Sequence, residues 1–294
     1  MIALIGTGYW GSKILTTLQE MDIVVDQFDI KDNIQQIKSQ NVIVATPADT
    51  HAKITEMLLQ QNKNVLVEKP AFMNMEECTR IEKSLKSKYM SGHILLYSEH
   101  FDLINQRIKD ENIRHIECRR LNWGRAQKNI SPILHLAPHD IAVLDTFIGH
   151  IPNTVNCRAT YIKNETQPDY VVADLDYGQT TAQIQMGWYY HEKTRDISVI
   201  TDKGTLVWSD AKDKSKWISQ GIEQGRQIQH MDKNKTFSQS VTPLQRQIAA
   251  FVDYCEKDKL PDSNMEHIKR VTYIVECMQK SLKTGEVICP SKKY

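Results

Sequence analysis

The sequence predicts an α/β fold with a doubly wound parallel sheet, followed by an α+β region with a mainly antiparallel sheet. Apolar strands alternate with amphipathic helices over roughly the first 110 residues, which is typical of parallel strands joined by crossover helices. From residue 113 onward, strand-like runs follow one another through short turns, which favours antiparallel pairing. We therefore expect two domains, residues 1–115 and residues 116–294, without a flexible linker between them.

The composition is that of an ordinary globular protein. Hydrophobic residues make up 40% and charged residues 25% of the 294 residues, and the net charge is +1. This balance does not predict a partner held by bulk attraction, and we expect neither nucleic acid nor a membrane surface as a partner. No apolar run approaches the roughly 20 residues that span a bilayer, and the first residues already form a strand rather than a signal peptide. We expect a cytoplasmic protein whose six separated cysteines are free thiols.

Apolar periodicity predicts the elements of the first half. Strands are expected at residues 2–5, 23–28, 41–45, 64–67 and 89–97. Helices are expected at residues 12–21, 34–40, 49–61, 75–86 and 99–111. The ends of the first, third and fourth strands carry unusual residues, and parallel strands bring their carboxyl ends to one edge of the sheet. A ligand site is therefore expected at that edge.

The second half has a different order of predicted elements, with several strands in succession. Strands are expected at residues 116–122, 154–161, 170–176, 180–188, 197–201 and 205–208. Helices are expected at residues 138–148, 243–256 and 265–282. Residues 210–240 are polar and lack a clear period, so an exposed loop with room for a short edge strand is expected there.

A glycine-rich turn follows the first strand and opens the first helix. Its residues are Gly6, Thr7, Gly8, Tyr9, Trp10 and Gly11. In a turn of this kind the first glycine permits the tight bend, the second lets backbone approach a pyrophosphate, and the third lets the helix pack against the strand. The helix N-terminus also attracts phosphate charge. The turn therefore predicts a dinucleotide cofactor.

An acid ends the second strand, 18 residues after the last glycine of this turn. Asp29 stands where a carboxylate accepts hydrogen bonds from the adenosine ribose and repels a 2′-phosphate. We therefore predict NAD rather than NADP, with the adjoining Ile30 in the same cofactor site. A solvated turn is the alternative interpretation of Asp29, and Lys31 leaves some tolerance of NADP open.

The fourth strand ends abruptly in Glu68, Lys69 and Pro70. A proline cannot continue a central strand, and it favours an extended conformation at Lys69. Ligands of open parallel sheets bind beyond the carboxyl ends of the strands, so Lys69 stands where a reacting group would lie. These residues alone also permit a plain strand end followed by a turn.

Two histidines, His135 and His139, lie four residues apart around Pro138. On one helix such a pair could bind zinc. Pro138 suits the first position of a helix, however, so His135 is expected to precede the helix, and no metal site is predicted. His139 is then either a polar cap or a general base, since an imidazole titrates close to neutral pH.

Four motifs give the chain a resemblance to the Gfo/Idh/MocA oxidoreductases over essentially its full length. They are Gly6 to Gly11, Ala45-Thr46-Pro47 with His51, Glu68-Lys69-Pro70 and Pro138-His139-Asp140. The resemblance implies an N-terminal Rossmann domain that binds NAD and a C-terminal α+β domain with an open, mainly antiparallel sheet. It implies that Lys69 and His139 are catalytic and flank the nicotinamide and the reacting carbinol. It also adds further residues to the cofactor site, namely Thr46, Pro47, His51 and Glu68.

The chain looks closer still to one branch, the UDP-N-acetylglucosaminuronate 3-dehydrogenases and related nucleotide-sugar oxidoreductases. The matching stretches are Gly8 to Gly11, Gly92-His93, Arg120 to Arg125, Leu136 to Ile141, and Trp188 with Lys193 and Arg195. The resemblance implies hydride transfer between a sugar 3-hydroxyl and NAD, as used in polysaccharide biosynthesis. The chain departs from the branch at His135, where an acid is usual, and at Ser98 to His100, where Asn-Pro-Ala is usual.

Seven residues are candidates for contact with a sugar substrate. They are Lys69, Tyr97, Arg120, Arg125, His135, His139 and Arg195. The arginines suit carboxylate or diphosphate groups, or alternatively have structural roles. Alternatives to a nucleotide-sugar dehydrogenase are a reductase or dehydrogenase of a free polyol or ketosugar, and a non-catalytic NAD-binding sensor. A homodimer or homotetramer is expected, because an open sheet face in a monomer would expose a large apolar surface.

Overall fold

The computed structural model describes residues 1–29, 31–123, 130–163, 165–209, 214–223, 226–231 and 241–291. The chain divides into two compact units, Met1–Ser98 with Ser240–Tyr273, and Glu99–Gln239 with Ile274–Tyr294. This division differs from the expected boundary at residue 115, because α4 (Glu99–Ile108) belongs to the second unit and α6 (Pro243–Lys257) to the first. None of the helices in the described ranges is long and apolar enough to cross a membrane.

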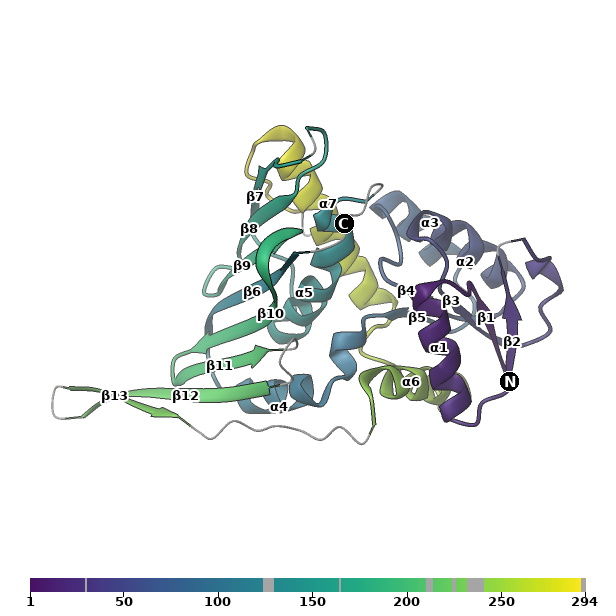
Figure 1. The fold of residues 1–294 in the computed structure, drawn as a ribbon, viewed down its shortest axis with the longest axis horizontal. Coiled ribbons are helices and arrows are strands. Elements are labelled where there is room, and N and C mark those ends of the chain that lie inside the picture. Colours follow the sequence, from purple (N-terminus) through teal and green to yellow (C-terminus); the bar gives the residue numbers. More distant parts are fainter. Residues whose placement is uncertain are drawn as a thin grey trace. The chain divides into compact units, whose positions relative to one another are not determined.

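The first unit contains a five-stranded parallel sheet with the order β2-β1-β3-β4-β5 (Figure 1). Its strands are β1 (Ile2–Ile5), β2 (Val25–Phe28), β3 (Asn41–Val44), β4 (Asn64–Glu68) and β5 (Tyr89–Gly92). Its helices include α1 (Tyr9–Glu20), α2 (His51–Gln60), α3 (Met75–Ser84) and α6, with the first part of α7 (Met265–Thr284). The predicted doubly wound parallel sheet is confirmed.

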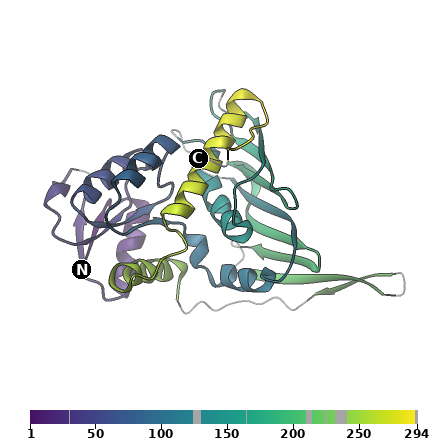
Figure 2. The same cartoon turned by 180° about the vertical axis from the view of Figure 1, so that it is seen from behind.

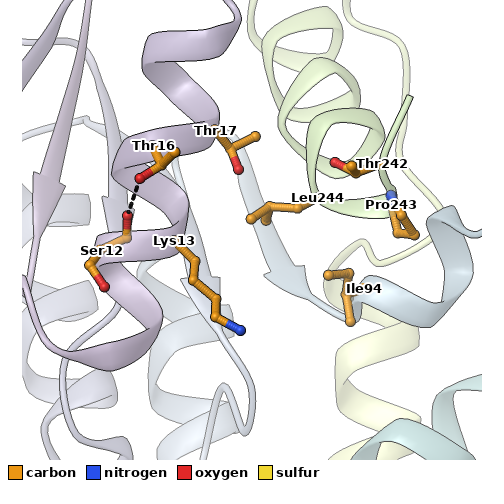
Figure 3. A pocket seen from close by; sticks show the side chains of 8 residues that line it. All are labelled: Ser12, Lys13, Thr16, Thr17, Ile94, Thr242, Pro243 and Leu244. Atoms are coloured by element: carbon orange, nitrogen blue, oxygen red, sulfur yellow. Dashed lines mark hydrogen bonds between the residues drawn. The ribbon is translucent and has the colours of Figure 1, made fainter. Parts of the chain in front are cut away.

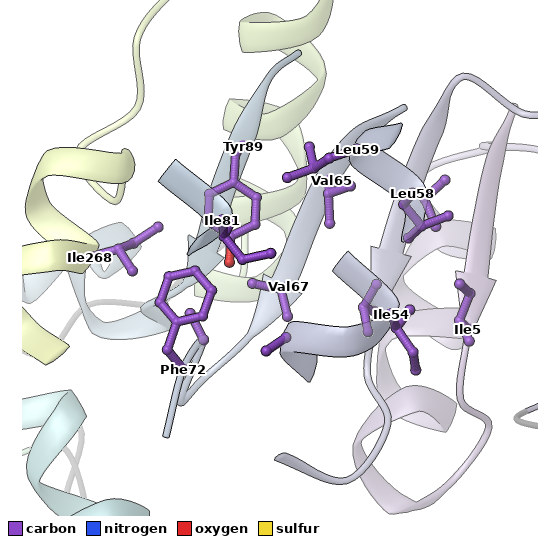
Figure 4. Packing of buried hydrophobic residues seen from close by; sticks show 14 of the residues in the cluster. Ile5, Ile54, Leu58, Leu59, Val65, Val67, Phe72, Ile81, Tyr89 and Ile268 are labelled. Carbon is purple, nitrogen blue, oxygen red and sulfur yellow. The ribbon is translucent and has the colours of Figure 1, made fainter. Parts of the chain in front are cut away.

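Both faces of this sheet are buried, as the apolar runs predict. Alternate strand residues such as Ala3, Val44 and Val67 form one hydrophobic cluster with α2 and α3, part of which is drawn in Figure 4. The intervening residues, such as Leu4, lie on the other face, where α1 packs through Ile14. Beyond the strand ends, Gly8, Asp29 and Pro47 are exposed, whereas β4 and β5 end in the buried Glu68 and Gly92.

Two predictions in the first unit were wrong. The expected helix at residues 34–40 is only a 3₁₀ turn, Ile34–Gln36, because the chain becomes extended at Ile37 to bury that side chain. The expected strand at 89–97 ends at Gly92, and Ile94–Tyr97 forms another 3₁₀ turn. The backbone N–H of His93 donates to the carbonyl of Ser91 at 2.9 Å, which bends the chain away from the sheet.

The second unit contains an eight-stranded sheet with the order β13-β12-β11-β10-β6-β9-β8-β7. Its strands are β6 (Ile113–Trp123), β7 (Thr154–Thr160), β8 (Tyr170–Asp176), β9 (Thr181–Gly187), β10 (Tyr189–Thr201), β11 (Gly204–Ser209), β12 (Lys214–Glu223) and β13 (Arg226–Met231). The β6–β9 pair is parallel and the other pairs are antiparallel, which confirms the mainly antiparallel sheet. The loop expected over residues 210–240 instead contains β12 and β13, which extend the sheet by antiparallel pairing.

Helix α5 (Pro132–Ile148) packs on one face of this sheet, against β6, β8 and β9 (Figure 2). The residues that alternate with the buried ones point to the opposite face, where polar side chains are mixed with Val172, Ile200 and Val207. Arg119 pairs with Asp196 at 2.9 Å, and Gln183 donates to Asp174 at 2.8 Å. The polar side chains on this face pair with one another across the strands, and the expected self-association stays a prediction.

Helix α5 begins six residues earlier than expected. Ser131 caps it by accepting a hydrogen bond from the N–H of Leu134, and Pro132 occupies the first turn. Pro138 lies inside the helix, where its missing N–H removes one backbone hydrogen bond without ending it. The true start signal is therefore Ser131-Pro132, and both His135 and His139 lie within the helix.

Candidate active site

The glycine turn is closely fitted to the backbone around it. Gly6 has a φ of 97°, and a Cβ there would lie 2.6 Å from the carbonyl oxygen of Ala45. A Cβ on Gly11 would overlap the carbonyl of Gly6. A Cβ on Gly8 would instead meet no atom within 4 Å, so this glycine borders open space beside the first turn of α1. The arrangement leaves room for a ligand at the second glycine, where the motif needs it.

The start of α1 suits a phosphate. In the part of the chain that the structure describes, no side chain caps the helix at Gly8, and its first turn contains no acid. Asp29 follows β2 directly and is exposed, and the N–H of Gly6 donates to Phe28 at 2.8 Å, which holds the two strand ends together. Ile30 lies outside the described residues. The residues present therefore fit a dinucleotide such as NAD.

His51 is a buried histidine at the start of α2. Its Nδ1 lies 2.8 Å from the carbonyl oxygen of Pro70, and its Nε2 lies 2.8 Å from that of Thr46. Burial lowers the pKa of His51, and the positive charge of Lys69 adds to the lowering, although the two carbonyl acceptors oppose it. His51 therefore joins the loops that follow β3 and β4, with Thr46 and Pro47 in the first and Lys69 at the start of the second.

Glu68 is the last residue of β4, and it is only 6% exposed. Burial raises the pKa of Glu68, against the opposing effects of Trp10 and then Lys69. One of its oxygens accepts from the N–H of Lys69 at 3.3 Å. Gly92, its neighbour on β5, has no room for a side chain, because a Cβ would lie 2.5 Å from the Glu68 carboxylate. Glu68 thus fills the space between β4, β5 and the glycine turn.

We call the group formed by His51, Glu68, Lys69 and His93 the Lys69 corner. The Lys69–Pro70 peptide bond is cis. The positive charge of Lys69 contributes to the pKa shifts of the other three side chains. The structure therefore brings the cofactor-site residues predicted from the third and fourth strands together within the first unit.

Tyr97 lies in the first unit but not at an open surface. Its side chain is 7% exposed, and its hydroxyl lies 2.8 Å from the Oγ of Ser263. This bond joins the 3₁₀ turn after β5 to the segment before α7. The position gives no support to the substrate contact that the sequence suggested for Tyr97, and it indicates a structural role instead.

In the second unit, α5 carries the histidines that the sequence singled out. His135 and His139 are one turn apart on this helix and share a face, which corrects the expectation that His135 precedes the helix. The His135 ring lies 5.3 Å from the ring of the buried Trp188. Among the described residues, no group of three or more His, Cys, Asp or Glu side chains gathers as a metal site would require.

The residue after His139 forms a buried ion pair. Asp140, 1% exposed, accepts from Arg120 of β6 with Nη2–Oδ1 at 2.7 Å and Nε–Oδ2 at 3.0 Å. Two parallel bonds of this kind fix the position of α5 on the sheet. The guanidinium of Arg120 is therefore engaged by Asp140. This contact favours a structural role for Arg120 over contact with substrate. Arg195 lies opposite Arg120 on β10, and Arg125 lies outside the described residues.

An open groove of about 490 Å³ lies between α1 and α6 (Figure 3). Its lining residues are Ser12, Lys13, Thr16, Thr17, Ile94, Thr242, Pro243 and Leu244. None of these eight residues is a predicted site residue, and they carry no pair of groups suited to acid–base chemistry. The groove is therefore not a candidate for the reacting centre.

Sequence reasoning missed the side chains that complete the Lys69 corner. His93 bonds to His267, which is 174 residues away in the chain, and no local pattern predicts that partner. The role of Gly92 could have been predicted from the sequence, since a glycine inside a strand often marks the close approach of another group. Gln247 of α6 is fully buried and lowers the pKa of Glu68. No sequence pattern predicts this contact.

Comparison with protein-family models matches both parts of the chain. Residues 20–92 match an oxidoreductase family with an NAD-binding Rossmann fold, and residues 98–289 match the C-terminal alpha/beta domain of that family, Gfo/Idh/MocA. The first match begins after the glycine turn, so the turn is an additional observation. Together the matches cover most of the chain.

Individual relatives are distant. An uncharacterized oxidoreductase from Streptococcus pneumoniae is 20% identical over 69% of this chain and 66% of its own length. An inositol 2-dehydrogenase from Rhizobium meliloti is 30% identical over 26% of this chain and 24% of its own length. The structure of a UDP-N-acetylglucosamine 3-dehydrogenase from Acidithiobacillus ferrooxidans is 16% identical, with a TM-score of 0.80 over 96% of this chain and 97% of that chain. At this identity the structural likeness shows the fold alone.

Proposed function

The chain belongs to the Gfo/Idh/MocA oxidoreductase family, an NAD-binding family, and from this we propose that it oxidises or reduces a secondary alcohol of a sugar with NAD. The observation that carries the proposal is the edge of the parallel sheet, where the glycine turn, Asp29 and Lys69 follow three of its strands. The proposed reacting group is the 3-hydroxyl of a UDP-linked N-acetylhexosaminuronate or a related nucleotide sugar. The stretches that resemble the nucleotide-sugar branch support this class, and a UDP-N-acetylglucosamine 3-dehydrogenase has the same fold.

NAD, when bound, supplies the acceptor or donor of the hydride. Gly6, Gly8 and Gly11 would hold its pyrophosphate, and Asp29 would hold the adenosine ribose. In the oxidising direction, His139 accepts the hydroxyl proton as general base. Lys69 donates a hydrogen bond to the same oxygen and stabilises its developing negative charge. The two roles can be exchanged between these residues.

The test is to replace Lys69 or His139 by Ala and to measure turnover and NAD binding separately. Each variant should bind NAD with nearly the affinity of the parent and lose at least ~100-fold in turnover. Lys53→Ala and His191→Ala are matched controls, because both side chains are exposed and lie outside the site. Near-normal turnover in both Lys69→Ala and His139→Ala would refute the assignment.

The substrate class needs its own experiment. We propose to follow the absorbance of NADH while UDP-, dTDP- and GDP-linked sugars and their keto forms are added, with inositol in parallel. A response to inositol alone would favour the second candidate, a dehydrogenase or reductase of a free polyol, which the match to an inositol 2-dehydrogenase supports. Bound NADH that no sugar oxidises or reduces would instead favour a non-catalytic sensor. Self-association remains a prediction.

A further inference from the structure

An amide side chain lies on the buried face of α6. Gln247 is fully buried, one turn after Leu244, which lines the groove between α1 and α6 (Figure 3). A buried amide costs stability unless other polar groups take up its hydrogen bonds. In the described part of the chain, neither amide atom of Gln247 completes a hydrogen bond of ordinary geometry. The polar groups around Gln247 therefore decide what it does.

The group that Gln247 meets is the carboxyl of Glu68. In β4, Val65 and Val67 lie in the cluster formed with α2 and α3, so the alternating residue Glu68 points to the opposite face of the sheet. Helix α1 packs on that face, and α6 packs against α1. Gln247 acts on Glu68 as a hydrogen-bonding side chain, which agrees with this placement.

The same carboxyl meets the glycine turn. Trp10 is the second residue of α1, and its indole N–H also acts on Glu68 as a hydrogen-bonding group. Nε1 of Trp10 and Oε1 of Glu68 are buried, and neither completes a hydrogen bond of ordinary geometry among the described residues. Oε1 of Glu68 also lies against Gly92, where an added Cβ would be 2.5 Å away. An indole, a carboxyl and an amide thus share one buried space.

These three groups can satisfy one another in two ways. The indole of Trp10 only donates, whereas the amide of Gln247 both donates and accepts. When Glu68 is protonated, its O–H can donate to the amide carbonyl while the carboxyl accepts from the indole. When Glu68 is ionised, the indole and the amide N–H can both donate to it. Gln247 therefore suits both forms of the acid, and a leucine in its place would suit neither.

Lys69 is the charged side chain that acts on Glu68. Burial raises the pKa of Glu68, and the indole of Trp10 opposes the rise, followed by Lys69 and the amide of α6. Lys13 of α1 lies 5.5 Å from the centre of the Trp10 ring. The pKa of His93, at the next strand end, is held well below its usual value mainly by burial. The indole and the amide are thus neutral groups that favour the charged carboxyl.

We propose that Gln247 is a positioning residue of the cofactor site. Through Glu68 it holds the indole of Trp10 and with it the first turn of α1, whose free backbone N–H groups would bind the pyrophosphate of NAD. The carboxyl of Glu68 also accepts from the N–H of Lys69 at 3.3 Å, so the same contact holds the strand end that carries the proposed catalytic lysine. The inference rests on the NAD-binding part of the proposed function and not on the sugar.

The first experiment records the indole N–H signals of the isotope-labelled full chain against pH by NMR, with Trp10→Phe used for assignment. The Trp10 signal should follow the titration of Glu68 and lose this response in Glu68→Gln. In Gln247→Leu the signal should move, and its midpoint should rise by about half a pH unit, because a group that favours the charged carboxyl has gone. A Trp10 signal with the same position and pH response in all three proteins overturns the proposal.

The second experiment measures the affinity for NAD without any sugar. Gln247→Leu should raise the Kd by about two- to tenfold, which is the loss expected for one hydrogen bond. Gln247→Met repeats the test should the leucine variant not fold. An unchanged affinity overturns the proposal. A failure of every sugar to react while NAD still binds would concern the substrate class alone.

Gln245→Leu is the matched control on the same helix. Gln245 forms the capping box of α6 with Thr242, so its replacement should lower the thermal stability. It should leave both the Trp10 signal and the affinity for NAD unchanged, because Gln245 does not act on Glu68. Equal losses of affinity in Gln245→Leu and Gln247→Leu would show that the stability of α6 alone matters, and they would overturn the proposal.

Discussion

The Lys69 corner and the α5 face of the second unit bury titratable side chains in opposite ways. In the Lys69 corner, burial lowers the pKa of His51 and His93 and raises that of Glu68. The two carbonyls beside His51 oppose the lowering of its pKa, the N–H of Lys69 donates to Glu68, and a second imidazole bonds to His93. On α5, Asp140 stays opposite Arg120 in a two-bonded ion pair. We therefore expect the contribution of the Lys69 corner to stability to depend on pH and on side-chain size. We expect the contribution of the ion pair on α5 to be lost when either Arg120 or Asp140 is replaced.

The largest effect is expected from breaking the ion pair. Arg120→Ala leaves Asp140 buried without its cation, which should lower the free energy of unfolding by about 3–5 kcal/mol. Arg158→Ala is the matched control, because its partner Asp174 lies on the same sheet but the Arg158 side chain is 75% exposed. It should cost less than about 1 kcal/mol. Urea unfolding of both variants measures the difference, and equal losses would remove the contrast between the two regions.

The next effect concerns side-chain size in the Lys69 corner. Gly92→Ala places a Cβ against the Glu68 carboxylate, so the free energy of unfolding should fall by about 1–3 kcal/mol. Gly8→Ala meets no protein atom, so its thermal unfolding should match the parent while its affinity for NAD falls by about tenfold. Calorimetry and NAD titration separate the two effects. A stable Gly92→Ala protein would show that Glu68 can move aside.

The smallest effect is the pH dependence of stability. The pKa of His93 is lower in the folded protein than the unfolded value near 6.5, so its contribution to stability is complete above that value and is lost as pH falls through the folded value. Glu68, with a raised pKa, acts in the opposite sense, and its contribution is lost as pH rises. The difference in free energy of unfolding between the parent and His93→Gln should therefore shrink from about pH 7.5 to about pH 5. A constant difference would mean that His93 does not titrate with folding.

Much of the fold follows from local sequence patterns. Apolar runs that end in glycine, acid or proline predicted the five parallel strands, because both their composition and their ends are set locally. The start of α5 could not be placed as easily, since Pro132 and Pro138 both suit a first turn. The helix begins at Pro132 because its buried apolar side chains extend back to that residue. The strands β12 and β13 are polar, so pairing rather than local pattern defines them.

The candidate site shows the same limit more sharply. Residues that carry chemistry at a strand end, such as Lys69, stand out because their type is unusual there. Partners that are distant in the chain do not stand out, and His267 and Ser263 are recognised only when the fold brings them to His93 and Tyr97. Arg120 shows the opposite error. As an arginine it was a candidate for contact with substrate, but in the structure it pairs with Asp140.

The interleaved order of the two units has a consequence for how the protein is made. The parallel strands emerge from the ribosome within the first hundred residues, but Ser263 and His267 follow only after all the strands of the second unit. During that interval His93 and Tyr97 have no partners for their inward-facing polar groups, so the nascent first unit is held below its final stability. The protein should therefore depend on chaperones during synthesis more than a chain whose domains are completed one after the other.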